Sequence, residues 1–391
     1  MAGLVGMTMF ALTFILSMRL RFVEDLFGGL DKVYIAHGIL GGTALMLLLF
    51  HPILLVLKFI PSDLRTAALY LLPSAYWSVN FGIIALVGLA LLVAITLYSR
   101  MKYHTWKFTH EFLGLVFLFA ALHVFLVDGN ASRDYIFRGY DIFAVIVSLI
   151  GLGAFSYSLL LKNRILKEAI YRIELISQKK DMYEIRLVPD GKPIQYTSGQ
   201  FIFVRFYNEK LSKEAHPFTI ASKSNNPTIS IMVKNLGDFT SGLHHLKTGD
   251  KVAIEGPYGR FNMTSKNDTD QIWIAGGIGI TPFLGMAEDL IHKGRPHKVD
   301  LYYSARGDDD FIGLDTLTRL EKTSKNFRVF PWASDAKGRI GVKDIQKNSG
   351  NLKTKEYFLC GPGGFKTALK EALIEAGVKE SNIYEEEFTF R

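Results

Sequence analysis

Five apolar stretches in the first part of the chain constrain its fold more than any other feature. They cover residues 3–18, 32–59, 75–98, 108–127 and 140–161. An α-helix crosses the hydrocarbon core of a bilayer, about 30 Å thick, with about 20 mainly apolar residues. Because a backbone in lipid must satisfy its own hydrogen bonds, each stretch predicts a helix. The sequence therefore predicts a multi-domain membrane protein that begins with an all-α transmembrane helical bundle of five spans.

The ends of these stretches predict how the bundle is oriented. The first stretch is short and begins at Met1, but no Ala-x-Ala-like cleavage site follows it and Arg19 and Arg21 come directly after it, so we expect a retained helix. Lys and Arg gather on one side of the predicted bundle, whereas the loops 58–74 and 128–139 on the other side carry mixed charges. The positive-inside rule therefore predicts that the first side, and the whole C-terminal half, are cytoplasmic.

Two of the predicted spans carry a pair of histidines each. His37 and His51 stand 14 residues apart, and His110 and His123 stand 13 apart. At a rise of about 1.5 Å per residue, each pair separates by about 20 Å, so one imidazole lies toward either membrane face. Ionisable side chains within a span are costly and are usually functional. Imidazole is a standard axial ligand of haem iron, so the matched pairs predict two stacked b-type haems, one held by His37 and His110 and one by His51 and His123.

Other interpretations of these spans stay open. A single histidine of this kind is more often a helix-end residue or a satisfied polar side chain, but four in matched pairs favour ligands. Thirteen residues do not return to the same helix face, so we expect the second histidine helix to be bent or rewound, with Gly114 as a candidate site. Phe117 would fill the gap between two haems or pack ordinarily. Small residues of the first histidine span would admit a flat porphyrin or serve helix packing: Gly38, Gly41, Gly42 and Ala44.

Composition excludes several other classes of site. Cys360 is the only cysteine, which excludes an intrachain disulfide, a thiolate zinc site and a cysteine-ligated iron–sulfur cluster. The net charge of +8 comes largely from Lys and Arg that flank the apolar stretches. This pattern fits anchoring at a lipid bilayer and does not suggest nucleic acid as a partner.

The residues after the membrane spans predict two soluble domains. Six segments with alternating apolar residues predict strands of a small antiparallel β-barrel, at 171–176, 182–188, 200–206, 216–222, 228–234 and 251–256. From residue 269 the pattern changes to strand, glycine-rich turn and helix, at 271–290 and again at 356–373. This order predicts an α/β domain with a parallel sheet and ligands at the carboxyl ends of its strands. We place the domains at residues 1–163, 164–264 and 265–391.

The glycine-rich turn of the α/β domain is a candidate nucleotide site. Gly276, Gly277 and Gly279 follow a strand and precede a helix that opens with Thr281 and Pro282. Glycines let a backbone approach a pyrophosphate, and a helix N-terminus supplies N–H groups to it, although a glycine turn in any α/β fold looks similar.

Further candidates lie in the next strand and in the predicted barrel. Ser304 and Arg306 would bind a ribose 2′-phosphate, which selects NADPH, or belong to a solvated loop. The run His216, Pro217, Phe218 and Thr219 would set an aromatic ring and a hydroxyl against a flavin. The run of Lys234, Gly237 and Thr240 offers a cation, a turn and a hydroxyl to a diphosphate.

These motifs, in this order, resemble the ferric reductase/NADPH oxidase superfamily, and most closely the bacterial NADPH oxidases. The likeness covers almost the whole chain. Its residues are the four histidines, HPFT at 216–219, VKNLGDFT at 233–240, EGPYG at 255–259, AGGIGITP at 275–282, YYSARG at 302–307, CGPGGF at 360–365 and the aromatic Phe390. Members of the superfamily commonly have six spans, and this chain resembles them without the first.

The resemblance implies a role for each soluble motif. HPFT would contact the FAD isoalloxazine, the Lys–Gly–Thr run its pyrophosphate, and the turn from Gly276 to Pro282 the nicotinamide nucleotide. Cys360, Gly361 and Pro362 would lie near the nicotinamide ring, and Phe390 would cover the flavin and move aside for hydride transfer. Cys360 and Phe390 are thus the expected catalytic residues.

The resemblance also implies an activity. It predicts a plasma-membrane NADPH oxidase that passes electrons from cytoplasmic NADPH, with NADH as an alternative donor, through FAD and two haems to O2 outside, giving superoxide. Without a visible calcium-binding loop or regulatory extension, it implies a constitutively active form with no obligatory protein partner. Arg133 or Arg138 would stabilise superoxide or act as ordinary interfacial cations. The alternatives are an extracytoplasmic ferric or cupric reductase, a non-enzymatic haem subunit and a transporter with a histidine proton relay.

Overall fold

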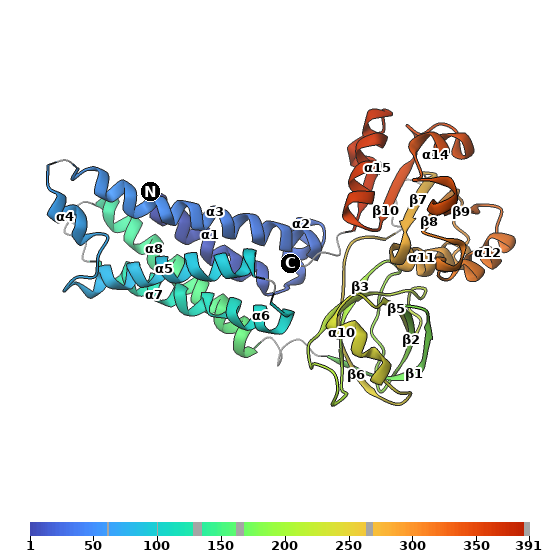
Figure 1. Ribbon diagram of the computed structural model, residues 1–391, viewed down its shortest axis with the longest axis horizontal. Helices are drawn as coiled ribbons and strands as arrows, with labels where there is room; N and C mark the ends of the chain where they lie inside the picture. Colours follow the sequence, from blue (N-terminus) through green and yellow to red (C-terminus); the bar gives the residue numbers. More distant parts are fainter. Residues whose placement is uncertain (61, 100, 128–134, 162–167, 263–268, 387–391) are drawn as a thin grey trace. The chain divides into compact units, whose positions relative to one another are not determined.

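The chain folds into two compact units, residues Met1–Leu166 and Lys167–Arg391. The structure, a computed structural model, describes residues 1–386 apart from 61, 100, 128–134, 162–167 and 263–268, and only the backbone of 135–138 (Figure 1). Phe390, Arg133 and the side chain of Arg138 therefore lie outside the described residues.

The first unit is helical. Its elements are α1 (Ala2–Ser17), α2 (Arg21–Phe27), α3 (Leu30–Leu57), α4 (Leu64–Leu69), α5 (Trp77–Tyr98), α6 (Tyr103–Glu111), α7 (Leu113–Leu126), α8 (Tyr135–Ser156) and the π-helical turn η1 (Tyr157–Leu161). The long helices lie side by side along this unit, with α4 at one end and with α2 and α6 at the other (Figure 1). They form the predicted helical bundle.

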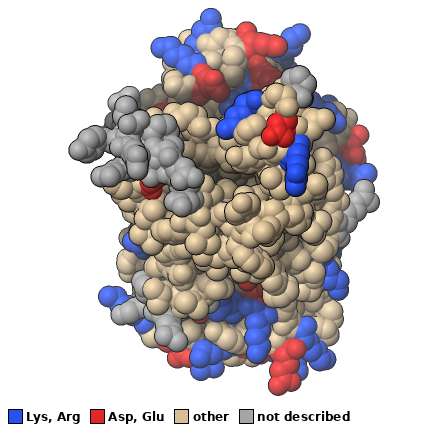
Figure 2. All heavy atoms as spheres, turned by 90° about the vertical axis from the view of Figure 1, so that its left-hand side faces the viewer, with Lys and Arg blue, Asp and Glu red and all other residues tan. Residues whose placement is uncertain are grey.

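Four segments of the described chain are long and apolar enough to cross a membrane. They are Leu30–Leu57, Trp77–Tyr98, Tyr103–Leu126 and Gly139–Leu161, and they confirm four of the five predicted spans by length and composition. The first predicted span differs, because α1 has only 16 residues and α2 turns away from it by 111°. It counts as a fifth span only if this bent pair is one broken span. Figure 2 looks onto the end of the bundle that carries α4 and shows a broad face of uncharged residues.

The centre of the bundle is an aromatic cluster between α1, α7 and α8. The Phe117 ring of α7 is fully buried, with its centroid 5.1 Å from the Phe10 ring and 5.2 Å from the Phe14 ring of α1. A side chain at Gly151 of α8 would overlap the Phe117 ring. Phe117 therefore packs ordinarily inside the bundle, which was one of its two predicted roles.

The predicted irregularity of the second histidine helix is present. The helix breaks at Phe112, between α6 and α7, where the Phe112 amide bonds the carbonyl of Thr109 in a tight turn. This break lies two residues before Gly114, which was the candidate site. Gly114 instead has a packing role, because a side chain there would overlap the Phe155 ring of α8.

The second unit begins with a curled six-stranded antiparallel sheet. Its strands are β1 (Ala169–Lys179), β2 (Met182–Pro189), β3 (Phe201–Phe206), β4 (His216–Thr219), β5 (Ile229–Lys234) and β6 (Lys251–Tyr258), in the order β4-β3-β6-β1-β2-β5. A single antiparallel bridge between Ile220 and Ile231 joins the two edges of the sheet. All six predicted strands are present, because alternating residues such as Ile229, Ile231 and Val233 point into one core.

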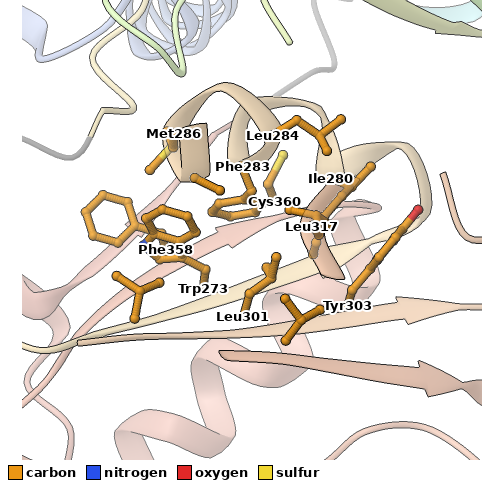
Figure 3. Packing of buried hydrophobic residues seen from close by; sticks show 14 of the residues in the cluster. Trp273, Ile280, Phe283, Leu284, Met286, Leu301, Tyr303, Leu317, Phe358 and Cys360 are labelled. Atoms are coloured by element: carbon orange, nitrogen blue, oxygen red, sulfur yellow. The ribbon is translucent and has the colours of Figure 1, made fainter. Parts of the chain in front are cut away.

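The rest of the unit is a five-stranded parallel sheet, in the order β11-β10-β7-β8-β9. Its strands are β7 (Gln271–Gly276), β8 (Val299–Ala305), β9 (Phe327–Ala333), β10 (Glu356–Cys360) and β11 (Ile383–Glu385). The helices beside them are α11 (Thr281–His292), α12 (Leu314–Thr323), α13 (Ser334–Lys337), α14 (Val342–Ser349) and α15 (Gly363–Glu375). The predicted α/β domain is confirmed, with β11 as an edge strand that the sequence analysis missed. Figure 3 shows the core between this sheet and α11.

A buried carboxylate joins the barrel to the parallel sheet domain. Asp289 of α11 accepts hydrogen bonds from the hydroxyls of Ser198, at 2.7 Å, and Ser224, both from barrel loops, and from the Lys293 ammonium at 3.1 Å. Burial alone would raise the pKa of Asp289, but these hydrogen bonds and the Lys293 charge lower it below its ordinary value. The carboxylate stays charged, and it fixes the two domains that border the clefts described below.

Candidate functional site

The bundle brings His37 and His110, one of the two predicted pairs, together. The ring centroids of His37 in α3 and His110 in α6 lie 6.0 Å apart, with the rings inclined by 52°. Two imidazoles that bind the same metal ion from opposite sides, each at a typical metal–nitrogen distance of about 2 Å, would have ring centroids about 6 Å apart. The separation therefore matches that of two axial ligands of one iron.

Backbone carbonyls fix the rings of two histidines. The Nδ1 atom of His37 lies 3.0 Å from the Thr13 carbonyl oxygen of α1, and that of His123 lies 2.6 Å from the Ser78 carbonyl oxygen of α5. A carbonyl only accepts hydrogen bonds, so Nδ1 carries the proton and Nε2 keeps its lone pair. Metal-bound histidines in proteins ordinarily use their second nitrogen in this way.

His110 is held by side chains instead. The Thr96 hydroxyl of α5 donates to the Leu92 carbonyl at 2.8 Å, so it accepts from His110 Nδ1 at 3.2 Å. The Trp106 ring stacks on the His110 imidazole, with centroids 5.2 Å apart and planes inclined by 21°. These contacts again leave Nε2 of the imidazole for a metal ion.

His51 of α3 and His123 of α7 are the second predicted pair, and they lie near each other in the bundle. Among the described residues, no cluster of three or more His, Cys, Asp or Glu side chains is suited to bind a metal ion. Two levels of paired imidazoles, with Nδ1 engaged in three of the four, fit bis-histidine haem and do not fit a mononuclear metal site. Haem ligation itself stays a prediction.

The two candidate flavin motifs meet in the barrel. The His216 ring at the start of β4 stacks on the Phe239 ring of the short helix α10 (Asp238–Ser241), with centroids 3.6 Å apart. Pro217 and Phe218 are partly exposed in the same strand. The hydroxyl of Thr219 is buried without a hydrogen-bond partner in the part of the chain that the structure describes. An unsatisfied buried polar group costs about 1–3 kcal/mol, so Thr219 fits a site where a ligand supplies the partner.

The predicted diphosphate run has a different internal role. The Thr240 hydroxyl accepts hydrogen bonds from the amides of Leu236 and Gly237, at 2.9 and 3.0 Å. It therefore holds the turn into α10, and its contact with a diphosphate stays a prediction. The Lys234 ammonium lies 3.5 Å from the Asp181 carboxylate. Gly237 leaves its backbone open, since no heavy atom lies within 4 Å of an added Cβ.

The glycine turns of the α/β domain pack against each other. Gly276 ends β7, Gly279 follows it, and Gly361 follows β10, the strand beside it. A side chain at Gly279 would overlap the Cys360 carbonyl oxygen, and one at Gly361 would come within 3.1 Å of the Gly276 backbone. Gly361, with φ +157°, and Gly277, with φ +56°, also have backbones that favour glycine. Thr281 and Pro282 open α11 directly behind these turns.

Cys360 lies away from any surface. Its side chain is fully buried in the core cluster beside Phe283 and Ile280 (Figure 3). The buried side chain leaves the backbone of the turn at Gly361 as the part nearest a bound nucleotide, and a position of Cys360 near the nicotinamide ring stays a prediction. The other predicted catalytic residue, Phe390, lies outside the described residues.

Two clefts border the parallel sheet. One, of about 770 Å³, is lined by Lys234, Gly277 and Arg306, together with the β1–β2 hairpin and the loop 305–316. The other, of about 540 Å³, is lined by Ser304, Pro362 and Arg339. Ser304 and Arg306, predicted to act together on a 2′-phosphate, thus line different clefts. Ser304 lies within β8, whereas Arg306 lies in the loop that follows this strand.

Arg339 is a site candidate that the sequence analysis missed. It shares the smaller cleft with Ser304 and with Ser334, which follows β9. Arg306 is 84% exposed and lies 3.8 Å from the Asp335 carboxylate. The run Ser334 to Arg339 follows a strand of the parallel sheet, and this position was the available signal, since ligands bind at strand carboxyl ends.

We expect Arg339, more than Arg306, to select NADPH over NADH. A charge-assisted hydrogen bond contributes about 1.5–3 kcal/mol, so Arg339→Ala should raise the KM for NADPH about 10- to 100-fold and leave that for NADH nearly unchanged. Steady-state kinetics would give the KM for NADPH and for NADH, in this variant and in Arg306→Ala. If Arg306→Ala raised the KM for NADPH more selectively than Arg339→Ala does, the 2′-phosphate would bind in the larger cleft beside Arg306.

Family comparisons agree with this arrangement. Residues 2–121 match a ferric reductase like transmembrane component, residues 167–262 an FAD-binding domain and residues 273–371 an oxidoreductase NAD-binding domain. The fold and sites therefore define a membrane protein that carries FAD- and NAD-binding oxidoreductase domains. This is the domain architecture of the ferric reductase/NADPH oxidase superfamily.

Individual relatives cover only part of the chain. It is 30% identical over 231 residues to the phenol hydroxylase P5 protein of Acinetobacter pittii (strain PHEA-2), an alignment that covers 55% of this chain and 64% of that protein. It is 28% identical over 216 residues to flavohemoprotein A of Dictyostelium discoideum, covering 51% and 54%. The chain thus spans between about half and two thirds of the length of these curated relatives.

Solved structures show the same soluble fold. The flavohem-like FAD/NAD-binding domain of nitric oxide dioxygenase from Vibrio cholerae O1 biovar El Tor matches with a TM-score of 0.51 at 21% identity, covering 56% of this chain and 97% of that chain. The Amycolatopsis cytochrome P450 reductase GcoB matches with a TM-score of 0.51 at 20% identity, covering 57% and 70%. At these identities the likeness shows the fold alone.

Proposed function

We propose that this protein is a transmembrane NADPH oxidase, which takes reducing equivalents from cytoplasmic NADPH and delivers electrons to O2 on the other side of the membrane as superoxide. The observation that carries the proposal is the 6.0 Å separation of the His37 and His110 rings inside an apolar bundle, in a chain that also has FAD- and NAD-binding domains. When bound, FAD supplies the change from two-electron to one-electron transfer, and each haem supplies a one-electron carrier.

The soluble residues would hold the donor and the flavin. The turns at Gly276 and Gly361 let the nucleotide approach the backbone, and Arg339 gives charge to its phosphate. The stacked pair His216 and Phe239 and the buried hydroxyl of Thr219 border the flavin. In this proposal these residues bind and orient, and the bound cofactors do the redox chemistry.

The membrane residues would hold the electron carriers. His37 with His110, and His51 with His123, are the proposed axial ligands at the inner and outer levels. A haem held by two imidazoles would have no ligand position left for O2, so when bound it would supply single electrons to O2 without binding it. Basic residues such as Arg19, Arg21 and Lys32 favour the cytoplasm for the inner level and for the soluble unit.

Cytochrome c reduction tests this proposal against metal reduction. The full chain, purified in detergent with FAD and haem, would be given NADPH in air with cytochrome c as the indicator, with and without superoxide dismutase. If dismutase abolishes the signal, the product is superoxide and the oxidase function stands. If reduction persists with dismutase, electrons reach other acceptors directly and a ferric or cupric reductase replaces the oxidase.

A further inference from the structure

The two outer histidines lie against glycines of the neighbouring helices. His51 of α3 meets Gly3 of α1, and His123 of α7 meets Gly82 of α5. A Cβ atom added at either glycine would lie 2.8 Å from the histidine Nδ1, 3.0 Å from Cε1 and 3.1 Å from Cγ. The same ring atoms are met at the same distances in both places, so one arrangement occurs twice, in the helix pairs α1–α3 and α5–α7.

Gly3 and Gly82 allow the histidine rings to approach the backbone of the neighbouring helix closely. Neither glycine has a positive φ angle, so an L-residue would not strain the backbone. Glycine inside a helix costs about 1 kcal/mol relative to alanine, which makes its use here unfavourable for the helix itself. The histidine rings occupy the space that a side chain would fill.

The contact at Gly82 also protects a hydrogen bond. A helical side chain points toward the N-terminus and covers the preceding turn. At Gly82 that turn contains Ser78, whose carbonyl oxygen lies 2.6 Å from His123 Nδ1. A methyl group at position 82 would therefore occupy the space through which the imidazole reaches its carbonyl partner.

We propose that Gly3 and Gly82 are positioning residues that set the rings of His51 and His123 for iron ligation at the outer level. This inference rests on the proposed haem ligation and adds to it two residues outside the ligand set. An alanine at either position needs an ordinary contact of at least 3.4 Å, so the ring must move by about 0.6 Å. Ligating groups must be held to within about 0.5 Å, so the displaced imidazole no longer binds its iron productively.

The effect should be confined to the outer level. At the inner level, none of the described glycines has His37 or His110 among the nearest neighbours of an added Cβ; His37 is held by the Thr13 carbonyl and His110 by the Thr96 hydroxyl and the Trp106 ring. A substitution at Gly82 therefore leaves the inner contacts unchanged.

Haem content and spectroscopy of Gly82→Ala test the inference. The full chain would be purified in detergent and measured for haem per polypeptide, for FAD per polypeptide and for low-spin haem signals by electron paramagnetic resonance. We expect haem per polypeptide to fall to half of the wild-type value, with one of two low-spin signals lost and the FAD content unchanged. Gly3→Ala should lose the same signal.

Two other glycines provide matched controls. Gly88→Ala, also on α5, places a Cβ 2.9 Å from Val116 of α7 and disturbs the same helix pair without touching a histidine. Gly153→Ala in α8 meets nothing within 4 Å. Both should keep two haems and both signals.

The outcomes separate this inference from the proposed function. Two haems with unshifted signals in Gly82→Ala would overturn the positioning role and leave the oxidase proposal intact. Equal haem loss in Gly88→Ala would overturn the role as well, because general packing would then explain it. A wild-type protein that binds no haem would overturn the proposed function itself.

Discussion

Replacing His51 by alanine is expected to halve the haem content and to stop electron delivery to the outer acceptor, while NADPH still reduces the bound flavin. The flavin and nucleotide residues lie in the soluble unit, Lys167–Arg391, and His51 lies in the other unit. Removing an axial ligand acts only on the iron that it holds. Three measurements check these results: haem per polypeptide for haem content, flavin bleaching by NADPH under anaerobic conditions for flavin reduction, and cytochrome c reduction in air for electron delivery.

His104 is the matched control for this prediction. It lies exposed in α6, six residues before His110, and contacts neither histidine pair in the described structure. His104→Ala should therefore keep the haem content and acceptor reduction of the wild type. If His51→Ala abolished flavin reduction together with acceptor reduction, the two units would not act as separate modules.

Replacing Gly279 by alanine is expected to disable the nucleotide site. The added methyl group would overlap the Cys360 carbonyl oxygen, and a Cβ at Gly361 would also come within 3.1 Å of the Gly276 backbone, so the two turns are closely packed. Overpacking of this kind typically costs about 1–3 kcal/mol, which predicts that the KM for NADPH rises by about 10- to 100-fold. Stopped-flow reduction of the flavin across a range of NADPH concentrations would measure this change.

Gly285→Ala distinguishes the turn from its surroundings. This substitution creates a comparable overlap, with the Ser222 carbonyl oxygen, on the side of α11 that faces the barrel. It should lower thermal stability without a selective change in KM for NADPH. A similar rise in KM for both variants would indicate that α11 is displaced in each, and would contradict a specific role for the turn.

The sequence predicted the fold well where one pattern has one physical cause. Long apolar stretches predicted four spans, and short runs rich in alternating apolar residues predicted all six barrel strands, since burial governs both patterns. The first span was less predictable, because the turn at Arg19, with φ +57°, and the 111° bend that follows depend on contacts with other helices. The edge strand β11 was missed because three residues are too few to form a pattern.

The sites were predictable as residue types but less so as contacts. Spacing paired the histidines correctly by level, and the break needed by the 13-residue spacing was found, although at Phe112. The sequence did not predict which way individual side chains point. Cys360 is buried, the Thr240 hydroxyl bonds its own turn, and Arg339 lines the same cleft as Ser304 whereas Arg306 lines the other, none of which a residue pattern shows.

The central claim is that two bis-histidine haems receive electrons from NADPH through the soluble unit. Its most direct test is an absorption spectrum of the purified full chain with FAD, recorded anaerobically before and after NADPH is added. The account predicts two low-spin haems per polypeptide whose Soret and α bands shift to the reduced positions. A protein without haem, or with haem that NADPH leaves oxidised while the flavin is reduced, would contradict it.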